Sequence, residues 1–425
     1  MSASPRIVIT GTGAVCGAGL GVDTIWDAVR SGRSAIGPIR QWDAAHWPVQ
    51  KAAEVTVDNR TLVSDRKLHK SITRTDLFGL CAADQAIAQS GLNAYRATLD
   101  ETAATAFNDR TGIIAGSGGG SYRNNYDFFA AMTPAAGSQE AFGREVMNCV
   151  NPMWLLKVLP NNVLCHVGIR HGFKGSNACI TNHCAGGALA VAEAAAALRA
   201  GEADRMVAVG HDAPFEPETV LHFHRVGLLS TDTLRPFDAA RSGTIFGEGA
   251  AALVLETAEL AERRNAAVVG EFLGSGCVTE GHGILELRPD GDGLARALEI
   301  ALADAGIAPA QVGLVVAHGN GTEASDASEA LALRRVFGDD LPPVTAFKWA
   351  FGHLIAASAT LDLALALRAL QDKVGPGIAT LNTLDPRLAP LPVASTPQAP
   401  RSDVAAVLCR GFGGMSVALI VRAGA

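Results

Sequence analysis

The sequence holds 425 residues, of which 48% are hydrophobic and 18% charged, and its formal net charge is −7 at pH 7. This length and apolar content allow a large core in two or three domains or in one duplicated fold, and they exclude a disordered chain. The negative charge argues against a nucleic-acid surface, which usually carries a basic excess. Charged residues such as Glu193 and Asp362 interrupt the apolar stretches, so none reaches the roughly 18 residues of a membrane span.

The spacing of the cysteines and the first six residues indicate the cellular compartment of the protein. The eight cysteines show no C-x-x-C pair and no regular spacing. Residues 1–6 lead into a strand without the apolar segment of a signal peptide. We therefore expect free thiols in a reducing cytoplasm.

Strands and helices alternate along the chain, and the order then repeats. The first half holds predicted strands at 6–15, 111–115, 204–210 and 251–255, with helices after residue 23, where Asp23 is the expected cap, at 65–92 and at 188–199. The second half holds predicted strands at 266–276, 312–317, 404–408 and 417–421, with helices at 293–305, 327–337 and 352–370. The repeat predicts an internally duplicated α/β fold with halves 1–257 and 258–425.

Two glycine-rich stretches invite comparison with nucleotide-binding motifs. The Thr-Gly steps of residues 10–13 lack the third glycine of a dinucleotide fingerprint, and residues 116–120 lack the Lys-Ser/Thr of a phosphate-binding loop. We expect a tight turn beside the active site at 116–120, with phosphate wrapping as the alternative.

Cys184 lies where a short predicted strand ends and the helix at 188–199 is about to begin. A helix N-terminus offers unpaired N–H groups and the positive end of the helix dipole, which favour a thiolate and can hold an oxyanion. The small residues Ala185, Gly186 and Gly187 would let a substrate approach. A buried structural cysteine is the alternative.

Three further stretches place polar groups at the ends of apolar elements. His318 leaves a strand into a Gly-rich loop, Lys348 follows a strand, and His353 precedes an Ala-rich helix. Residues 410–416, Arg-Gly-Phe-Gly-Gly-Met-Ser, form a turn between two buried strands, where the N–H of Phe412 could face a pocket. Satisfied core histidines, a surface lysine and a plain hairpin turn are the alternatives for these groups taken singly.

Taken together and in order, these motifs resemble the β-ketoacyl-acyl carrier protein synthase family over nearly the whole chain. The resemblance includes Arg-Ile-Val-Ile-Thr-Gly-Thr-Gly at the start, the Cys184 turn, Arg-Pro-Phe-Asp with Gly-Glu-Gly-Ala, His-Gly-Asn-Gly-Thr, Gly-His at 352–353 and Gly-Phe-Gly-Gly. It implies a thiolase-like fold of five layers, αβαβα, and a dimer, either of one chain or with a related subunit. It also implies decarboxylating condensation of an acyl chain with malonyl-acyl carrier protein, with no cofactor and no metal.

The resemblance also implies roles for single residues. Cys184 would carry the acyl chain, and the N–H groups of Cys184 and Phe412 would form the oxyanion hole. His318 and His353 would hold the malonyl carbonyl, while Lys348, paired with Glu329, would order the histidines. The basic cluster of residues 66–74 lies where the family docks its acidic carrier; the residues that would dock it are Arg66, Lys67, Lys70 and Arg74.

Five positions depart from the family pattern, and they bear on the substrate rather than on the reaction. They are His183 in place of Ala, Gly186 in place of Ser, Ser242 in place of Asp, Arg410 in place of Phe and Ser416 in place of Asn. We therefore expect a specialised pathway, such as polyene or polyketide assembly, rather than housekeeping fatty acid synthesis. The alternatives are a non-elongating partner subunit, an acyltransferase and a scaffold that only binds acyl carriers.

Overall fold

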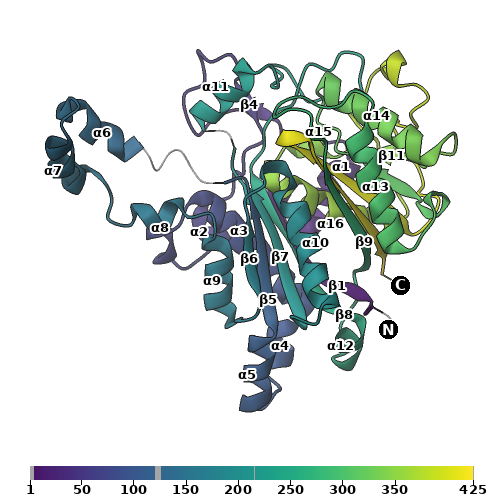
Figure 1. Ribbon diagram of the computed structural model, residues 1–425, viewed down its shortest axis with the longest axis horizontal. Helices are drawn as coiled ribbons and strands as arrows, with labels where there is room; N and C mark the ends of the chain where they lie inside the picture. The colour runs from purple at the N-terminus through teal and green to yellow at the C-terminus, as the bar shows by residue number, and fades with distance from the viewer. Residues whose placement is uncertain (1–3, 120–125, 215, 425) are drawn as a thin grey trace.

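The computed structural model describes residues 4–119, 126–214 and 216–424, and a large mixed sheet runs through it (Figure 1). Within these residues the sheet has 11 strands in the order β11-β10-β12-β13-β9-β1-β8-β7-β5-β6, with β2 beside β1. The strands of the first half are β1 (Ile7–Cys16), β2 (Gly19–Leu20), β5 (Thr111–Ser117), β6 (Asn177–Ile180), β7 (Arg205–Asp212) and β8 (Gly249–Thr257). Those of the second half are β9 (Gly270–Thr279), β10 (Leu314–Val316), β11 (Val344–Thr345), β12 (Val404–Gly411) and β13 (Met415–Ala423). A separate pair joins β3 (Gly37–Pro38) and β4 (Lys51–Ala52).

Helices lie outside and between the two half-sheets, so the expected five-layered, thiolase-like arrangement is observed. Helices α3 (Arg74–Ser90) and α9 (Asn162–His171) cover the first half-sheet, and α13 (Asp292–Ala305) with α14 (Glu323–Phe337) covers the second. Between the half-sheets lie α10 (Gly186–Arg199) and α16 (Ser358–Gln371). The central helices are rich in Ala and Leu, and nearly every residue of α16 is buried, because a helix covered by sheets on both sides must be apolar all round.

The half-sheets join at a short junction, where β1 pairs with β9 over Ile7 to Ile9. The division into halves at residue 257 stays a prediction. None of the helices in the described ranges is both long enough and apolar enough to cross a membrane.

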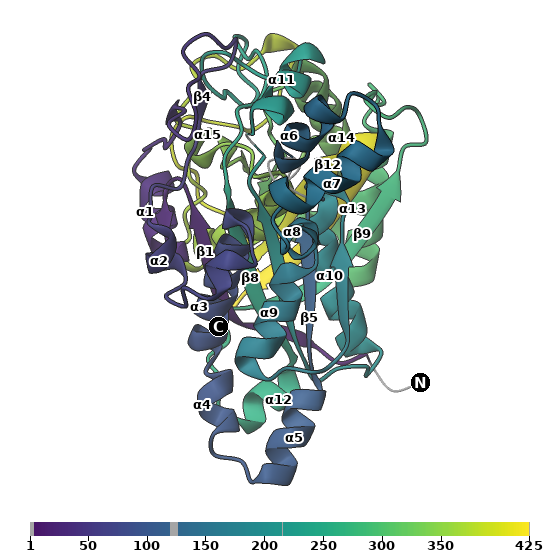
Figure 2. The same ribbon diagram turned by 90° about the vertical axis from the view of Figure 1, so that its left-hand side faces the viewer.

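The remaining helices lie around this core, and two of them project from it. Figures 1 and 2 show α6 and α7 packed against each other at the end of an arm that leaves the body of the molecule. The helices outside the five layers are α1 (Val22–Arg30), α2 (Asn59–Leu62), α4 (Leu92–Arg96), α5 (Glu101–Asp109), α6 (Tyr126–Ala135), α7 (Gln139–Cys149), α8 (Trp154–Val158), α11 (Pro217–Arg225), α12 (Ala258–Arg263) and α15 (Lys348–Phe351).

Three predicted helix starts are wrong. Helix α1 is preceded by Gly21, and Asp23 lies inside its first turn. The helix predicted from residue 65 begins at Arg74, because Thr73 and Asp76 form a reciprocal capping box there. The helix predicted from residue 352 begins at Ser358, after residues with positive φ interrupt the chain. Consequently Arg66, Lys67 and Lys70 precede α3, Arg74 is its first residue, and His353 lies in a loop before α16 rather than on the helix.

Candidate active site

Cys184 occupies a 3-10 turn, residues His183–Ala185, between the end of β6 and the start of α10. This confirms the predicted strand-to-helix junction. The glycines after Ala185 are needed for close packing of the backbone, rather than for the approach of a substrate. A side chain at Gly187 would collide with the carbonyl oxygen of Ala356, and one at Gly186 would press on the backbone of Ser117. The glycines therefore allow α10 to approach its neighbours and fix the position of the turn.

Two buried histidines face each other beside this turn. His318 follows β10 and His353 follows α15, and their ring centroids are 5.3 Å apart in an edge-to-face arrangement. Burial, followed by the charge of Lys348, lowers the pKa of both rings well below the usual value. Both histidines are therefore neutral at physiological pH.

Hydrogen bonds to Nδ1 fix the tautomer of both rings. Nδ1 of His318 accepts from the backbone N–H of Arg410 at 3.3 Å, and Nδ1 of His353 accepts from the N–H of Ile355 at 3.1 Å. The hydroxyl of Ser358 also reaches Nδ1 of His353, at 2.9 Å. A neutral ring that accepts at Nδ1 carries its proton on Nε2. Each histidine thus presents an Nε2–H donor to its surroundings.

Lys348 is buried, but its partner is not the one expected. Its Nζ lies 2.9 Å from Oδ2 of Asp362, and both side chains are 1% exposed. The carboxylate of Glu329 instead accepts from the backbone N–H groups of His318 at 2.7 Å and Gly319 at 2.9 Å. The direct partner of Lys348 is therefore Asp362, whereas Glu329 holds the loop that carries His318 and interacts with the charge of Lys348 without a direct ion pair among the described residues.

Asp362 is thus a residue of the site that the sequence analysis missed. It lies in the first half of α16, surrounded by buried alanines and leucines. A lone carboxylate inside an otherwise apolar helix was the available signal, because a buried charge needs a partner.

The turn after β12 brings the predicted oxyanion hole next to Cys184. Gly411 lies against Cys184, so that a side chain at Gly411 would touch Cβ of Cys184 at 3.6 Å. Phe412 follows, and positive φ values at Gly413 and Gly414 reverse the chain into β13. Within the described part of the chain, no backbone acceptor is found for the N–H of Cys184 or Phe412. The assignment of these two groups to an oxyanion hole stays a prediction.

The thiol of Cys184 is more basic than its place before a helix predicts. Burial raises its pKa well above the ordinary value, the nearby Cys409 and Asp212 act in the same direction, and Lys348 only partly opposes them. The expected preference for thiolate in the free protein is therefore wrong, because loss of hydration outweighs the helix dipole. Cys409 donates its own S–H to the carbonyl oxygen of Cys184 at 3.2 Å.

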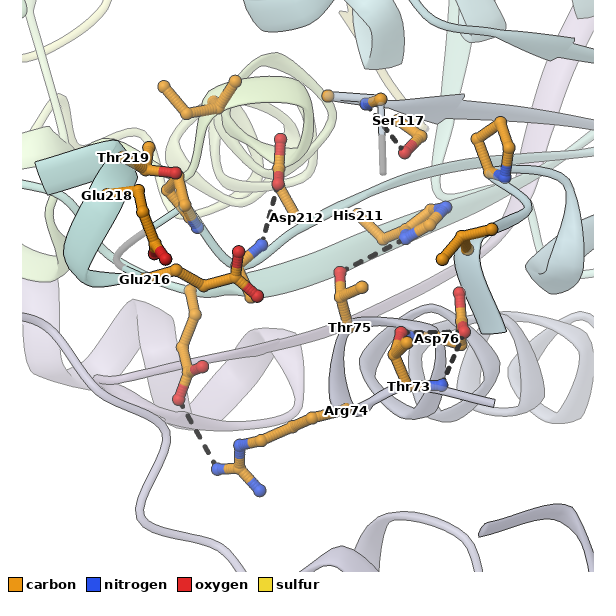
Figure 3. A pocket seen from close by; sticks show the side chains of 18 of the residues that line it. Thr73, Arg74, Thr75, Asp76, Ser117, His211, Asp212, Glu216, Glu218 and Thr219 are labelled. Carbon is orange, nitrogen blue, oxygen red and sulfur yellow. Dashed lines mark hydrogen bonds and ion pairs between the residues drawn. The ribbon is translucent and has the colours of Figure 1, made fainter. Parts of the chain in front are cut away.

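A cavity of about 990 Å³ is lined in part by His183, the residue before Cys184, and by Ile355. Charged and polar side chains from α3, β7 and α11 line it, among them Asp76, His211 and Asp212 (Figure 3). Gly118 and Gly119 of the predicted turn at 116–120 also line it, and Gly120 lies outside the described residues. Gly116 and Ser117 of the predicted turn belong to β5 instead, and Gly118 and Gly119 line the cavity after the strand ends.

The departures from the family pattern fall into two places. His183 contacts the nucleophile, with Nδ1 3.4 Å from Sγ of Cys184. Arg410 is buried and pairs with Glu280 at 3.0 Å, and its charge also lowers the pKa of His318. Ser416 lies opposite Arg410 in the β12–β13 pair and is fully buried. Ser242 lies away from this strand pair, and its hydroxyl is 2.9 Å from that of Ser230.

The four predicted docking residues differ in their exposure and contacts. Arg66, Lys67 and Lys70 are exposed in the segment before α3. Arg74 points inward, where its guanidinium bonds to Asn59 and the carbonyl of Val55 and lies over the ring of Phe78. Three residues therefore offer positive charge to a partner, and Arg74 serves the fold.

Comparisons with known proteins agree over the length of the chain. The family models named "Beta-ketoacyl synthase, N-terminal domain" and "Beta-ketoacyl synthase, C-terminal domain" match residues 4–261 and 269–382. The 3-oxoacyl-[acyl-carrier-protein] synthase 2 of Coxiella burnetii is 32% identical over 89% of each chain. The tetracenomycin polyketide synthase ketoacyl synthase beta subunit of Streptomyces glaucescens is also 32% identical, over 99% of each. The solved structure titled "The ishigamide ketosynthase/chain length factor" superimposes over 100% of each chain, with a TM-score of 0.87 and 27% identity.

Proposed function

Because the chain belongs to the beta-ketoacyl synthase family, we propose that Cys184, His318, His353 and Lys348 carry out its condensation. The protein is a 3-oxoacyl-[acyl-carrier-protein] synthase, which joins an acyl chain to malonyl-acyl carrier protein with loss of carbon dioxide. In this proposal the acyl chain is first transferred to Sγ of Cys184. The N–H groups of Cys184 and Phe412 hold the carbonyl oxygen as it becomes an oxyanion.

The observation that carries the proposal is the pair of neutral histidines with fixed tautomers. Two Nε2–H donors, from His318 and His353, can bind the carbonyl oxygen of the malonyl thioester. As carbon dioxide leaves, negative charge develops on that oxygen, and preorganised donors in a buried site stabilise it strongly. The charge of Lys348 acts in the same direction. The resulting carbanion attacks the acyl carbon on Cys184, and the new carbon–carbon bond forms as the Cys184 thioester breaks.

A non-elongating partner subunit is the main alternative, and the relative from Streptomyces glaucescens is named as a beta subunit. The resemblance implies that such subunits usually lose the nucleophile. In this chain Cys184 lies within a site that retains both histidines and the buried lysine. These residues support elongation.

Peptide mapping tests the assignment of the nucleophile. The protein is incubated with an acyl-carrier-protein thioester, digested and examined by mass spectrometry. We expect the acyl group on Cys184, and an adduct on Cys409 or another cysteine would contradict the proposal. The variant Cys184→Ala, which keeps a small side chain in the turn, is the matched control and should remain unlabelled.

The acyl chain is proposed to lie in the cavity beside Cys184, and the lining favours a chain that bears oxygen atoms. Nε2 of His211 and Oε2 of Glu248 are buried there and have no hydrogen-bond partner among the described residues. A saturated chain would leave both atoms unsatisfied, at a cost of about 1–3 kcal/mol each. A hydroxyl group could donate to Oε2 of Glu248, and a hydroxyl or keto oxygen could accept from the N–H at Nε2 of His211. This supports a role in polyketide or polyene assembly rather than in saturated fatty acid synthesis.

Competition between acyl thioesters tests this substrate class. Octanoyl and the positional isomers of monohydroxyoctanoyl N-acetylcysteamine are offered together, and the acyl-enzyme masses are compared. We expect at least one hydroxylated chain to load faster than octanoyl, and His211→Leu to reduce that preference. Faster loading of octanoyl by both proteins would contradict the proposed class.

We propose that the protein acts as a dimer with a second copy or a related subunit. Strand β6 ends the sheet, and along β6 and α8 the chain exposes polar backbone and large apolar side chains such as Leu155 and Leu156. Phe129 and Met147 on the projecting arm are exposed as well. Light scattering of the purified chain should give twice the chain mass; a monomer that pairs only with a sister subunit would favour the heterodimer.

The cytoplasmic location stays a prediction, supported by the eight free cysteines.

A further inference from the structure

The residue before the nucleophile is a histidine whose ring lies against the thiol. Nδ1 of His183 is 3.4 Å from Sγ of Cys184. The ring packs against Phe223, stacked at 5.9 Å, and against Phe412, at 5.0 Å between centroids, and these two rings also contact each other. His183 also has a φ of +45°, a region that few residues other than glycine adopt. Such strain is concentrated at functional sites.

The thiol needs a proton acceptor before it can attack. Burial raises the pKa of Cys184, so the thiolate is scarce at neutral pH. Burial also lowers the pKa of His183, which keeps its ring neutral and able to accept a proton.

The other two histidines of the site are unsuited to this step. Nδ1 of His318 and Nδ1 of His353 each accept a backbone N–H, so the free nitrogen of each ring carries a proton. They are donors. His183, with Nδ1 directed at Sγ, is placed to accept.

We propose that His183 is the general base that takes the thiol proton of Cys184 during acyl transfer; this inference rests on the proposed function, in which Cys184 is acylated. The proton moves from Sγ to Nδ1, and Sγ forms a bond to the carbonyl carbon of the carrier thioester. The bond from that carbon to the carrier sulfur then breaks. The departing thiolate takes the proton back from Nδ1, so the imidazole ends neutral and no other reactant is needed.

Other ionisable groups also face the pair. Cys409 and Asp212 raise the pKa of the thiol, and Lys348 lowers it. His183 in turn lowers the pKa of His353. Burial raises the pKa of Asp212 to about 7, so this carboxyl titrates within the pH range used below. All these groups remain in every variant, so a difference between the pH profiles of a variant and the wild type reports on position 183.

Two substitutions at position 183 separate proton transfer from packing. His183→Gly accepts the positive φ without strain and leaves a space beside Sγ for added imidazole. His183→Asn also tolerates positive φ and keeps a polar side chain, but it has no basic nitrogen. Acylation by octanoyl N-acetylcysteamine is followed by intact mass between pH 6.5 and 8.5, and peptide mapping locates the acyl group.

Over this range the wild-type rate should follow only the titration of Asp212, because His183 stays neutral. Both variants should acylate about 100-fold more slowly at pH 7, the low end for general base catalysis. Their rates should rise about tenfold per pH unit, since removal of the proton then depends on hydroxide. Imidazole should accelerate the Gly variant more than the Asn variant.

Each contrary result has a distinct meaning. Wild-type rates in both variants would overturn the inference. Slow variants with the same pH profile as the wild type and no response to imidazole would overturn it too, because they would indicate a packing role. If the Gly variant does not fold, the pH profile of the Asn variant decides. An acyl group found on a cysteine other than Cys184 would overturn the proposed function itself.

Discussion

Removal of the carboxylate of Asp362 tests the buried ion pair with Lys348. Both side chains are 1% exposed, and Nζ lies 2.9 Å from Oδ2. In Asp362→Leu the ammonium group would stay buried without its counter-ion, and loss of one partner of such a pair costs about 3–5 kcal/mol. With a urea slope of roughly 3 kcal/mol per molar, the unfolding midpoint should fall by about 1–1.7 M.

Urea unfolding of four proteins, followed by circular dichroism, measures this cost. They are the wild type, Asp362→Leu, Lys348→Met and the double variant. The double variant should regain most of the lost stability, because apolar side chains often replace a buried pair without loss. It should still fail to decarboxylate malonyl-acyl carrier protein, since the charge of Lys348 is gone. A single Asp362→Leu variant as stable as the wild type, or a double variant no more stable than the single one, would refute this reasoning.

Three further predictions concern the histidines and the carrier. His353→Ala should abolish malonyl decarboxylation while Cys184 is still acylated, and equal loss of both steps would contradict the division of roles. Reversing Arg66 and Lys67 to Glu should raise KM for a carrier-bound substrate and leave a small thioester mimic unaffected; equal effects on both substrates would show a role in folding. Burial lowers the pKa of His211 to about 4, whereas the unfolded chain binds this proton near pH 6.5, so stability is lost as the pH falls between these values. Between pH 7 and 5, the free energy of unfolding of His211→Gln should therefore fall by about 2 kcal/mol less than that of the wild type. Urea unfolding at both pH values measures this difference, and equal losses of stability in the two proteins would contradict this cause.

The sequence predicted the parts of the site that lie at the ends of regular elements. Cys184 at a strand-to-helix junction, His318 after a strand and Phe412 in a hairpin turn are all placed by local patterns of apolar and small residues. In a layered α/β fold such element ends gather at one edge of the sheets. Local pattern and tertiary position therefore agree for these residues.

The remaining features depend on contacts between distant segments. The partner of Lys348 was mistaken because Glu329 and Asp362 lie on different helices, and only the packing of α16 brings Asp362 to the ammonium group. The pKa of the Cys184 thiol was misjudged because the helix dipole can be inferred locally, whereas burial by residues of both halves cannot. The contact of His183 with Sγ needed the backbone conformation of the turn, which the sequence does not specify.

The position of β12 and β13 has a consequence for synthesis on the ribosome. These strands come late in the chain, yet they lie between β10 and β9 in the middle of their half-sheet. A nascent chain that stops before Val404 cannot bring β9 and β10 together, and it lacks the turn with Phe412. Catalytic competence should therefore arise in a single late step, and a stalled or truncated chain would expose the central helix α16 to chaperones and proteases.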